Sequence, residues 1–401
     1  MSGNYTEAPS SPNRVPRNTE ALIVGGGPAG LAAAIALGQR GIASTVVEAR
    51  TFPIDKACGE GLMPDSRESL ARLGVHLHQR DGAPFLGIRF ANSAHSVDAT
   101  FRQGVGLGVR RPHLHRLLAE RALETGAHLL WNSRIQLPQF APGNAQPGAA
   151  LVNGQPIGFR WLIGADGQSS SVRRWAGLDR ARRRNLRFAF RTHYRIDPAA
   201  TRFDRVEVHW GRRGQLYITP VAPDCVCAVY IARDPQLVSA CHRDAILASF
   251  PGVAARLAHA HIVSRRRGAI TSSCKLHRVA SGSVALIGDA SGSADAITGE
   301  GLAISFRQAL ALAASIHSGS LAPYRRAHRH IARLPIAMGE LMLTLDRWPT
   351  LQVRALPALA QTPLFFQELL DAHMAERSLA SVFLRRGPRF GLGLLTKALS
   401  A

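Results

Sequence analysis

The chain reads Ala21-Leu-Ile-Val24-Gly25-Gly-Gly27-Pro28-Ala29-Gly30 near its start, and the helix-forming run Leu31–Gly38 follows without a break. The first four residues are a short apolar run typical of a buried strand. A second apolar run, Ala43–Val47, ends at Glu48. A strand, a GxGxxG loop, a helix, a second strand and an acid in this order are typical of a dinucleotide-binding βαβ unit.

Each glycine of the loop has a separate expected task. Gly25 permits the tight turn, Gly27 lets a pyrophosphate approach the backbone, and Gly30 lets the helix pack on the strand. The helix N-terminus supplies N–H groups to the phosphates, and Glu48 accepts hydrogen bonds from the ribose. The expected contacts of this unit are Gly25, Gly27, Pro28, Ala29, Gly30, Glu48 and Arg50.

Two later segments repeat the pattern of a strand that ends in a glycine-containing loop. The first is Trp161–Arg173, which contains Asp166-Gly167. In the second, Val284–Asp289 ends in Gly-Asp, and Gly299-Glu300-Gly301 then opens a helical run. The three segments together resemble the fingerprints of the p-hydroxybenzoate hydroxylase-like superfamily of FAD-dependent oxidoreductases. That group holds aromatic monooxygenases, geranylgeranyl reductases and flavin-dependent halogenases, and the resemblance spans roughly residues 20–320.

The resemblance implies a set of FAD contacts. Asp289 is expected to bind a ribityl hydroxyl, and the backbone of Gly299, Glu300, Gly301 and Leu302 to face the pyrimidine edge of the flavin. Asp166 is associated in the hydroxylases with FAD and NAD(P)H, although a loop-capping role explains it equally simply.

Two further segments resemble parts of the flavin site. The loop Asp55–Pro64 looks like the one that places a Cys-Gly pair near the flavin in the reductase branch, with Lys56 and Cys58 in it. Arg111 opens an Arg-x-x-Leu motif and resembles a flavin-contacting arginine; the alternative is a surface arginine.

Departures from the hydroxylase pattern leave the reaction open. Gly292 and Ala296 stand where hydroxylases have a histidine and a proline, which favours the reductase branch. The Trp-x-Trp-x-x-Pro signature of the halogenases is absent. There is no second GxGxxG unit, so either NAD(P)H visits the flavin transiently or a partner reductase supplies electrons.

The fold class expected is α/β: a Rossmann-like FAD-binding domain, an antiparallel-sheet substrate domain and C-terminal helices. We assign residues 1–19 to a disordered tail and 20–80, 105–180 and 268–320 to the FAD-binding domain. Residues 81–104 and 181–267 form the substrate domain, because Gly87–Phe101 and Arg187–Ile231 contain alternating apolar and polar residues. Residues 321–401 form the helical region, with expected helices at Leu321–Leu334, Ile336–Arg347 and Pro363–Met374.

The preferred function is an NAD(P)H-dependent monooxygenase that hydroxylates an aromatic or lipid-like secondary metabolite. The alternatives are a flavin-dependent C=C reductase of a prenyl or polyketide chain and a non-catalytic binding protein. Catalytic residues are unknown, with two weak candidates: Cys58 as a proton donor or a packing residue, and Tyr217 as a residue facing the flavin or a core aromatic.

Composition and charge limit the classes of binding partner that we expect. Lys+Arg 49 against Asp+Glu 27 gives a net charge of +22, but the arginines are scattered, so we expect no nucleic acid. We expect a small apolar or aromatic substrate, no metal and reduced cysteines. The N-terminal segment lacks the apolar core of a signal peptide, which favours a cytoplasmic protein. The basic and apolar tail 384–397 suggests peripheral membrane contact, although its Gly and Pro argue against an amphipathic helix.

Overall fold

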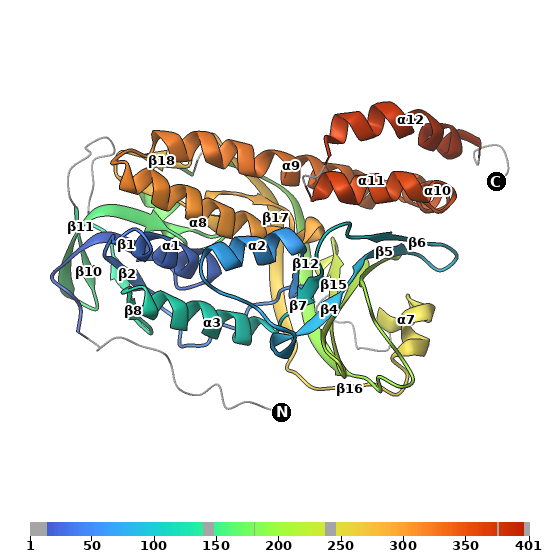
Figure 1. Ribbon diagram of the computed structural model, residues 1–401, viewed down its shortest axis with the longest axis horizontal. Helices are drawn as coiled ribbons and strands as arrows, with labels where there is room; N and C mark the ends of the chain where they lie inside the picture. The colour runs from blue at the N-terminus through green and yellow to red at the C-terminus, as the bar shows by residue number, and fades with distance from the viewer. Residues whose placement is uncertain (1–13, 139–147, 180, 237–245, 375–376, 397–401) are drawn as a thin grey trace.

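The computed structural model describes residues 14–138, 148–179, 181–236, 246–374 and 377–396 (Figure 1). Most of the tail expected to be disordered lies outside these residues. Asn18 and Thr19 do not belong to it, because they already form the start of the first strand.

A mainly parallel eight-stranded sheet is built on the βαβ unit. Ala21–Val24 pair with Ser44–Val47 on one side and with Trp161–Gly164 on the other, so the three expected strands are neighbours. Asn153 and Gly154 both have positive φ at the expected hairpin turn. In order across the sheet, the strands are β18 (Ala280–Ser281), β19 (Val284–Leu286), β11 (Gln155–Gly164), β1 (Asn18–Val24), β2 (Ser44–Val47) and β8 (His128–Leu130), with β9 (Ile135–Gln136) and β10 (Gly148–Val152) beside β11.

Helices cover this sheet because its strands are apolar on both faces. The largest hydrophobic core joins strand residues such as Ile23 and Ile163 to Leu31, Leu118 and Phe306 of three helices. The helices and helical turns of this part are α1 (Pro28–Gly38), α2 (Pro64–Arg72), α3 (Arg111–Glu124), α4 (Ser171–Trp175), α8 (Gly301–His317), η1 (Gln79–Asp81), η2 (Gly288–Ser291) and η3 (Ala296–Thr298).

A nine-stranded sheet forms the substrate domain. Its strands pair antiparallel except β13 and β5, which run parallel. Their order is β20 (Ser293–Ala294), β17 (Arg267–Leu276), β12 (Ala181–Arg195), β15 (Cys225–Ala232), β14 (Gln215–Ala222), β13 (Val206–Trp210), β5 (Gly87–Ala91) and β6 (Ser96–Thr100), with β16 (His261–Ile262) beside β12 and helix α7 (Pro251–Arg256) nearby. A three-stranded sheet of β3 (Gly61–Leu62), β7 (Gly106–Gly108) and β4 (Ala83–Phe85) lies between the two large sheets.

The expected boundary at residue 268 is wrong. Strand β17 pairs with β12 over Arg267–Leu276, so it belongs to the substrate sheet. The FAD-binding part therefore resumes after Leu276. The alternation that identified the other strands is interrupted in this one, which also contains consecutive small residues.

The C-terminal region consists of helices, as expected. They are α9 (Ala322–Arg347), α10 (Pro349–Gln361), α11 (Pro363–His373) and α12 (Leu379–Thr396). The expected helices Leu321–Leu334 and Ile336–Arg347 form one continuous helix, and the expected Pro363–Met374 agrees with α11 to within one residue. Pro335 does not end α9, and Pro388 lies inside α12, although a proline removes one helical hydrogen bond and crowds the carbonyl four residues earlier. Residues 384–396 are helical in α12, although their Gly and Pro led us to expect a poor amphipathic helix there. None of the described helices has the length and hydrophobicity needed to cross a membrane.

Candidate functional site

The glycines of the first loop divide into packed and open positions. A Cβ at Gly25, where φ is +109°, would lie 2.5 Å from the Ala165 oxygen, and one at Gly30 would collide with the Gly25 oxygen. A Cβ at Gly27 would meet no protein atom within 4 Å. The loop is thus closed towards the sheet and open at Gly27, where Pro28 and Ala29 begin α1. This shape fits a pyrophosphate at the helix N-terminus.

Glu48 lies at the carboxyl end of β2, beside this loop. Its Oε2 accepts a hydrogen bond from the Gly26 N–H at 2.8 Å, and its Oε1 accepts one from the Arg50 N–H at 2.8 Å. The carboxylate therefore holds the loop in place as well as being positioned for a ribose. The side chain of Arg50 is exposed.

An aromatic cluster supports the loop, and the sequence analysis did not find it. The rings of Phe52, His115 and Trp131 lie 5.2 to 5.5 Å apart. Burial lowers the pKa of His115 to about 4, so the ring is neutral. Its Nε2 donates to the Gly26 oxygen at 2.8 Å, while Nδ1 accepts from the Ile54 N–H.

Lys56 and Asp289 form an ion pair although they are far apart in the sequence. The Lys56 Nζ lies 3.3 Å from Asp289 Oδ2, and both side chains are nearly half exposed. Asp289 is in η2, directly after the strand β19. The structure thus brings the Cys-Gly loop to the Gly-Asp motif, as a shared flavin site requires.

The Gly299–Leu302 segment offers its backbone, not its acidic side chain. A Cβ at Gly299 or Gly301 would meet nothing within 4 Å. The Glu300 side chain is 1% exposed and turns towards Arg307 and His373, at 3.9 and 3.7 Å. Burial raises the pKa of Glu300 above its ordinary 4.5. Leu302 follows in the first turn of α8.

Arg111 is buried at the N-terminus of α3, so the surface-arginine alternative is wrong. Its backbone N–H donates to Glu60 Oε1 at 2.9 Å. Its Nε is buried with no hydrogen-bond partner among the described residues. An unpaired buried donor of this kind is consistent with a missing cofactor group.

Glu60 is the centre of a buried ionic network that the sequence analysis missed. Its Oε1 also accepts from Arg191 at 2.8 Å, and its Oε2 accepts from His193 Nε2 at 2.7 Å. A second carboxylate belongs to the network: Asp55 Oδ2 accepts from Arg191 at 2.9 Å. The network joins the Cys-Gly loop and α3 to strand β12 of the substrate sheet.

At Glu60 and at His193, burial and the hydrogen-bonding partner shift the pKa in opposite directions. Burial favours the neutral acid, but the hydrogen bond from His193, the charge of Arg191 and the Arg111 N–H outweigh it and hold the pKa of Glu60 below 4.5. Burial lowers the pKa of His193 below 6.5 more than Glu60 raises it. His193 is thus a neutral ring that donates to Glu60 and accepts from the Ser264 hydroxyl at 2.8 Å.

Of the two weak catalytic candidates, Cys58 lies beside this network and Tyr217 contacts other residues. Cys58 is partly buried, and its Sγ lies 3.4 Å from the Glu60 nitrogen, which donates to it. Tyr217 donates to Gln215 Oε1 at 3.1 Å and packs against the apolar cluster around Ile297, just before Gly299. Burial raises the pKa of Tyr217, which makes it a poor acid.

Asp166 has a structural task. Its Oδ2 accepts from the N–H groups of Ser171 and Val172 at 2.6 and 3.2 Å, so it caps α4. Its role towards FAD or NAD(P)H stays a prediction.

Among the described residues, the group of side chains with the spacing of metal ligands belongs partly to the Glu60 network. Donor atoms of Glu60, His193 and Cys227 lie within 4.8 Å of one another, but the carboxylate already pairs with Arg191, which disfavours a cation there. The cysteines at 58, 225 and 227 are free thiols, and Cys241 lies outside the described residues.

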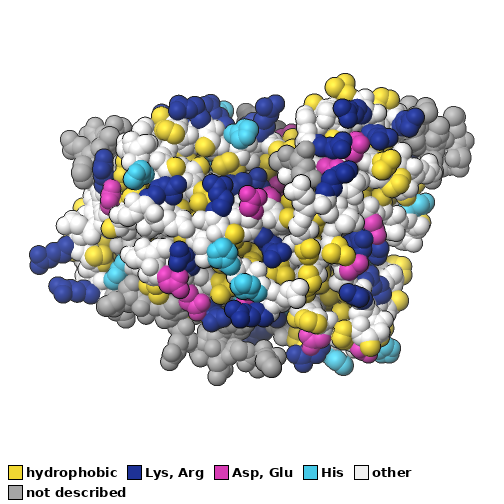
Figure 2. Space-filling model, in the orientation of Figure 1, with side chains coloured by type: hydrophobic (Ala, Val, Ile, Leu, Met, Phe, Trp, Pro, Cys, Tyr) yellow, Lys and Arg dark blue, Asp and Glu magenta, His cyan; other side chains and the backbone are white. Residues whose placement is uncertain are grey.

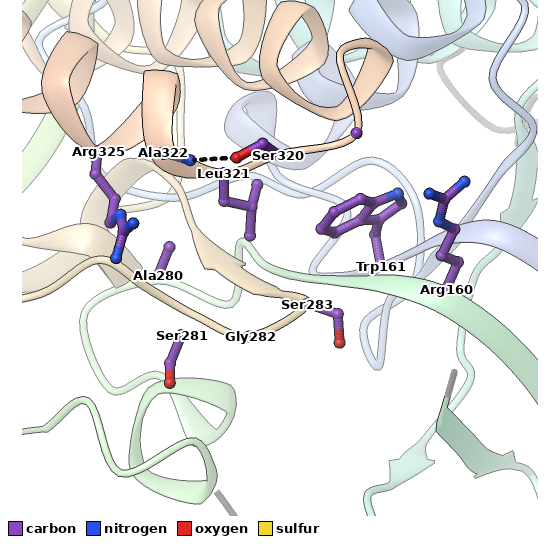
Figure 3. A pocket seen from close by; sticks show the side chains of 11 residues that line it. Arg160, Trp161, Ala280, Ser281, Gly282, Ser283, Ser320, Leu321, Ala322 and Arg325 are labelled. Atoms are coloured by element: carbon purple, nitrogen blue, oxygen red, sulfur yellow. Dashed lines mark hydrogen bonds between the residues drawn. The ribbon is translucent and has the colours of Figure 1, made fainter. Parts of the chain in front are cut away.

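A cavity of about 310 Å³ lies away from this site (Figure 3). Trp161 lines it at the amino end of the parallel stretch of β11, with Arg160, Ser281, Ser283 and Arg325. The glycine loops lie at the opposite, carboxyl end of the strands, where ligands of such sheets bind. We therefore assign the flavin to the loops and not to this cavity.

Comparison with known proteins agrees with this geometry. Residues 18–213 match the family described as FAD binding domain. The chain is 30% identical over 164 residues to a menaquinone reductase of Mycobacterium tuberculosis, a match that covers 40% of each chain. It is 31% identical over 163 residues to a rifampicin monooxygenase of Rhodococcus hoagii, covering 39% of this chain and 33% of the other. The matched stretch is thus less than half of either relative.

Solved structures share the fold over most of the chain. A flavoprotein/dehydrogenase from Cytophaga hutchinsonii is similar with a TM-score of 0.76 and 18% identity, over 89% of this chain and 92% of that one. A geranylgeranyl bacteriochlorophyll reductase-like protein from Thermoplasma acidophilum has a TM-score of 0.71 and 18% identity, over 93% and 99%. The expected α/β fold and the resemblance to this group of flavoproteins are confirmed.

Proposed function

Because the chain carries an FAD-binding domain over residues 18–213, we propose that this oxidoreductase is an NAD(P)H-dependent monooxygenase acting on an aromatic or lipid-like secondary metabolite. The FAD assignment rests on the ion pair between Lys56 and Asp289, which lies beside the open glycine loops. Bound FAD supplies two-electron redox chemistry between NAD(P)H and the substrate.

The residues of this chain divide the work of holding FAD. The open side of Gly27 and the first turn of α1 receive the pyrophosphate, and Glu48 lies where a ribose would bind. Asp289, held by Lys56, is assigned to the ribityl chain. The unpaired Nε of Arg111 and the open backbone at Gly299 and Gly301 are assigned to the flavin ring.

The substrate sheet provides the opposite wall of the site. A Cβ added at Gly61 would lie 3.5 Å from the side chain of Thr219 on β14. This strand therefore lies directly against the Cys-Gly loop segment. The neighbouring Tyr217, Ile297, Met342 and Leu343 belong to one apolar cluster between the sheet and α9. An apolar or aromatic substrate would be desolvated against such a surface.

A C=C reductase is the second candidate, and one observation favours it. Menaquinone reductases of Mycobacterium tuberculosis and Mycolicibacterium smegmatis are 30% identical to this chain over 164 and 166 residues. Cys58 would then serve as proton donor beside the flavin, with its loop held by the Glu60 network.

One experiment separates these functions. The purified protein, reconstituted with FAD, is mixed with NADH or NADPH with and without O₂, and NAD(P)H oxidation, H₂O₂ and products are followed. The monooxygenase proposal expects NAD(P)H oxidation that requires O₂ and yields H₂O₂ or a hydroxylated product. Anaerobic reduction of a quinone or prenyl acceptor at the aerobic rate would favour the reductase. Slow flavin reduction that speeds up with an added flavin reductase would assign electron supply to a partner protein.

A further inference from the structure

The last helices expose large apolar side chains. Trp348 is 57% exposed at the corner between α9 and α10, and Val353 is 66% exposed on α10. Leu384 on α12 is 80% exposed, the highest value among the exposed large hydrophobic residues of the described chain. Exposing such side chains costs free energy in water, so we ask which of them lie beside charges that would complete a contact surface.

The charges beside these apolar residues are of one sign. In the described residues between 347 and 396, the acidic side chains are those of Glu368 and Asp371, and both are buried. Asp371 pairs with Arg102 at 2.7 Å, and Glu368 faces Arg386 at 3.5 Å. The exposed charged residues of this segment are all basic: Arg347, Arg354, Arg377, Arg385 and Arg389. The outward electrostatic potential of the segment is therefore positive.

The two features coincide on helix α12. Leu384, Arg385, Pro388 and Arg389 are exposed and occupy one helical face at a spacing of one and four residues. On the other face Val382 is buried and the Phe390 ring packs 4.7 Å from that of Phe365. Figure 2 shows basic side chains along the edge formed by α9 and α12, with apolar side chains between them.

We propose that the exposed face of α12 formed by Leu384, Arg385 and Arg389 docks the protein on an anionic lipid bilayer. Arginines are attracted to anionic headgroups, while the leucine side chain enters the interface. The apolar residues project from convex helices, and the described cavities are lined by other residues, so the surface suits a bilayer better than a partner peptide. Docking would bring the flavin site to substrates dissolved in the membrane; this last consequence alone rests on the proposed function.

The test is flotation of the FAD-loaded protein with vesicles of phosphatidylcholine alone or with one third phosphatidylglycerol, at 0.1 and 0.5 M salt. We expect binding to the anionic vesicles that weakens with salt. Leu384→Glu and the double change Arg385→Glu, Arg389→Glu should each weaken it roughly tenfold or more. The control Leu186→Glu changes an exposed leucine of β12 and should bind like wild type.

The flavin absorption band of each variant shows that it is folded, so binding is judged independently of activity. Binding by Leu384→Glu and the arginine double variant at the wild-type level would overturn the proposal. Equal binding of the protein to both kinds of vesicle would also overturn the proposal. Binding of the protein to an acidic protein, without binding to vesicles, would overturn it as well. A protein with no monooxygenase activity that still binds anionic vesicles in this way would support the surface and refute only the proposed function.

Discussion

Replacing Glu60 with glutamine tests the buried joint between the FAD-binding part and the substrate sheet. The carboxylate is fully buried and accepts from Arg191, His193 and the Arg111 N–H, all within 2.9 Å. Glu60→Gln keeps the shape but leaves the Arg191 guanidinium without its buried counter-charge. Breaking one partner of a buried ion pair costs about 3–5 kcal/mol, and the part-exposed Asp55 that also pairs with Arg191 favours the lower end.

We therefore expect the free energy of unfolding to fall by about 3 kcal/mol. The measurement is urea unfolding at saturating FAD, followed by circular dichroism and flavin fluorescence. The control is Glu124→Gln, because Glu124 is 62% exposed and pairs with Arg121 on the surface. That control should cost less than about 1 kcal/mol. If the free energy of unfolding falls by the same amount in the two variants, the buried Glu60 network does not stabilise the protein as described.

The pH dependence gives a second check. His193 has its pKa lowered in the folded state, so the unfolded chain binds more protons just below pH 6.5 and stability falls as the pH drops from there. Glu60 has its pKa lowered as well, so its contribution is present above 4.5 and is lost as the pH falls through its folded-state pKa. His193→Gln should flatten the loss that begins near pH 6.5. The flattening is partial, because buried His115 and His328 have pKa values of about 4 and titrate over the same window.

Three further changes test the flavin site. Gly27→Ala should fold normally but lose stoichiometric FAD, since the added Cβ occupies the space open to the pyrophosphate; Gly252→Ala, also at an unobstructed position, should stay yellow, and a yellow Gly27→Ala protein would contradict the assigned loop. Asp289→Ala should weaken FAD binding at least tenfold by fluorescence titration without lowering thermal stability of the apoprotein, and wild-type affinity would remove Asp289 from the ribityl site. Cys58→Ser should leave flavin reduction by NAD(P)H unchanged in stopped-flow experiments; a large drop in the rate of substrate reduction would assign it the proton-donor role, and unimpaired substrate reduction would leave it as a packing residue.

Local patterns were sufficient for the dinucleotide unit. Gly25, Gly27 and Gly30 have a spacing that only a tight strand-to-helix turn requires, and the structure shows that turn. The hairpin at Asn153-Gly154 and the alternating strands of the substrate sheet were predictable for the same reason, because turn conformation and side-chain alternation are local properties. The resemblance in three motifs then predicted that Asp289 contacts FAD, and the separate Arg-x-x-Leu motif predicted the same of Arg111.

Long-range contacts decided the rest. Glu60 reads as one acid in a glycine-rich loop, and only the fold brings it to Arg191 and His193, which lie more than 130 residues later in the chain. The same holds for the Lys56 and Asp289 contact and for β17, whose partner strand β12 and not its own pattern assigns it to the substrate sheet. Burial of a charged group is set by what packs around it, so the sequence shows that an acid is present but not whether it will be exposed, paired or neutral.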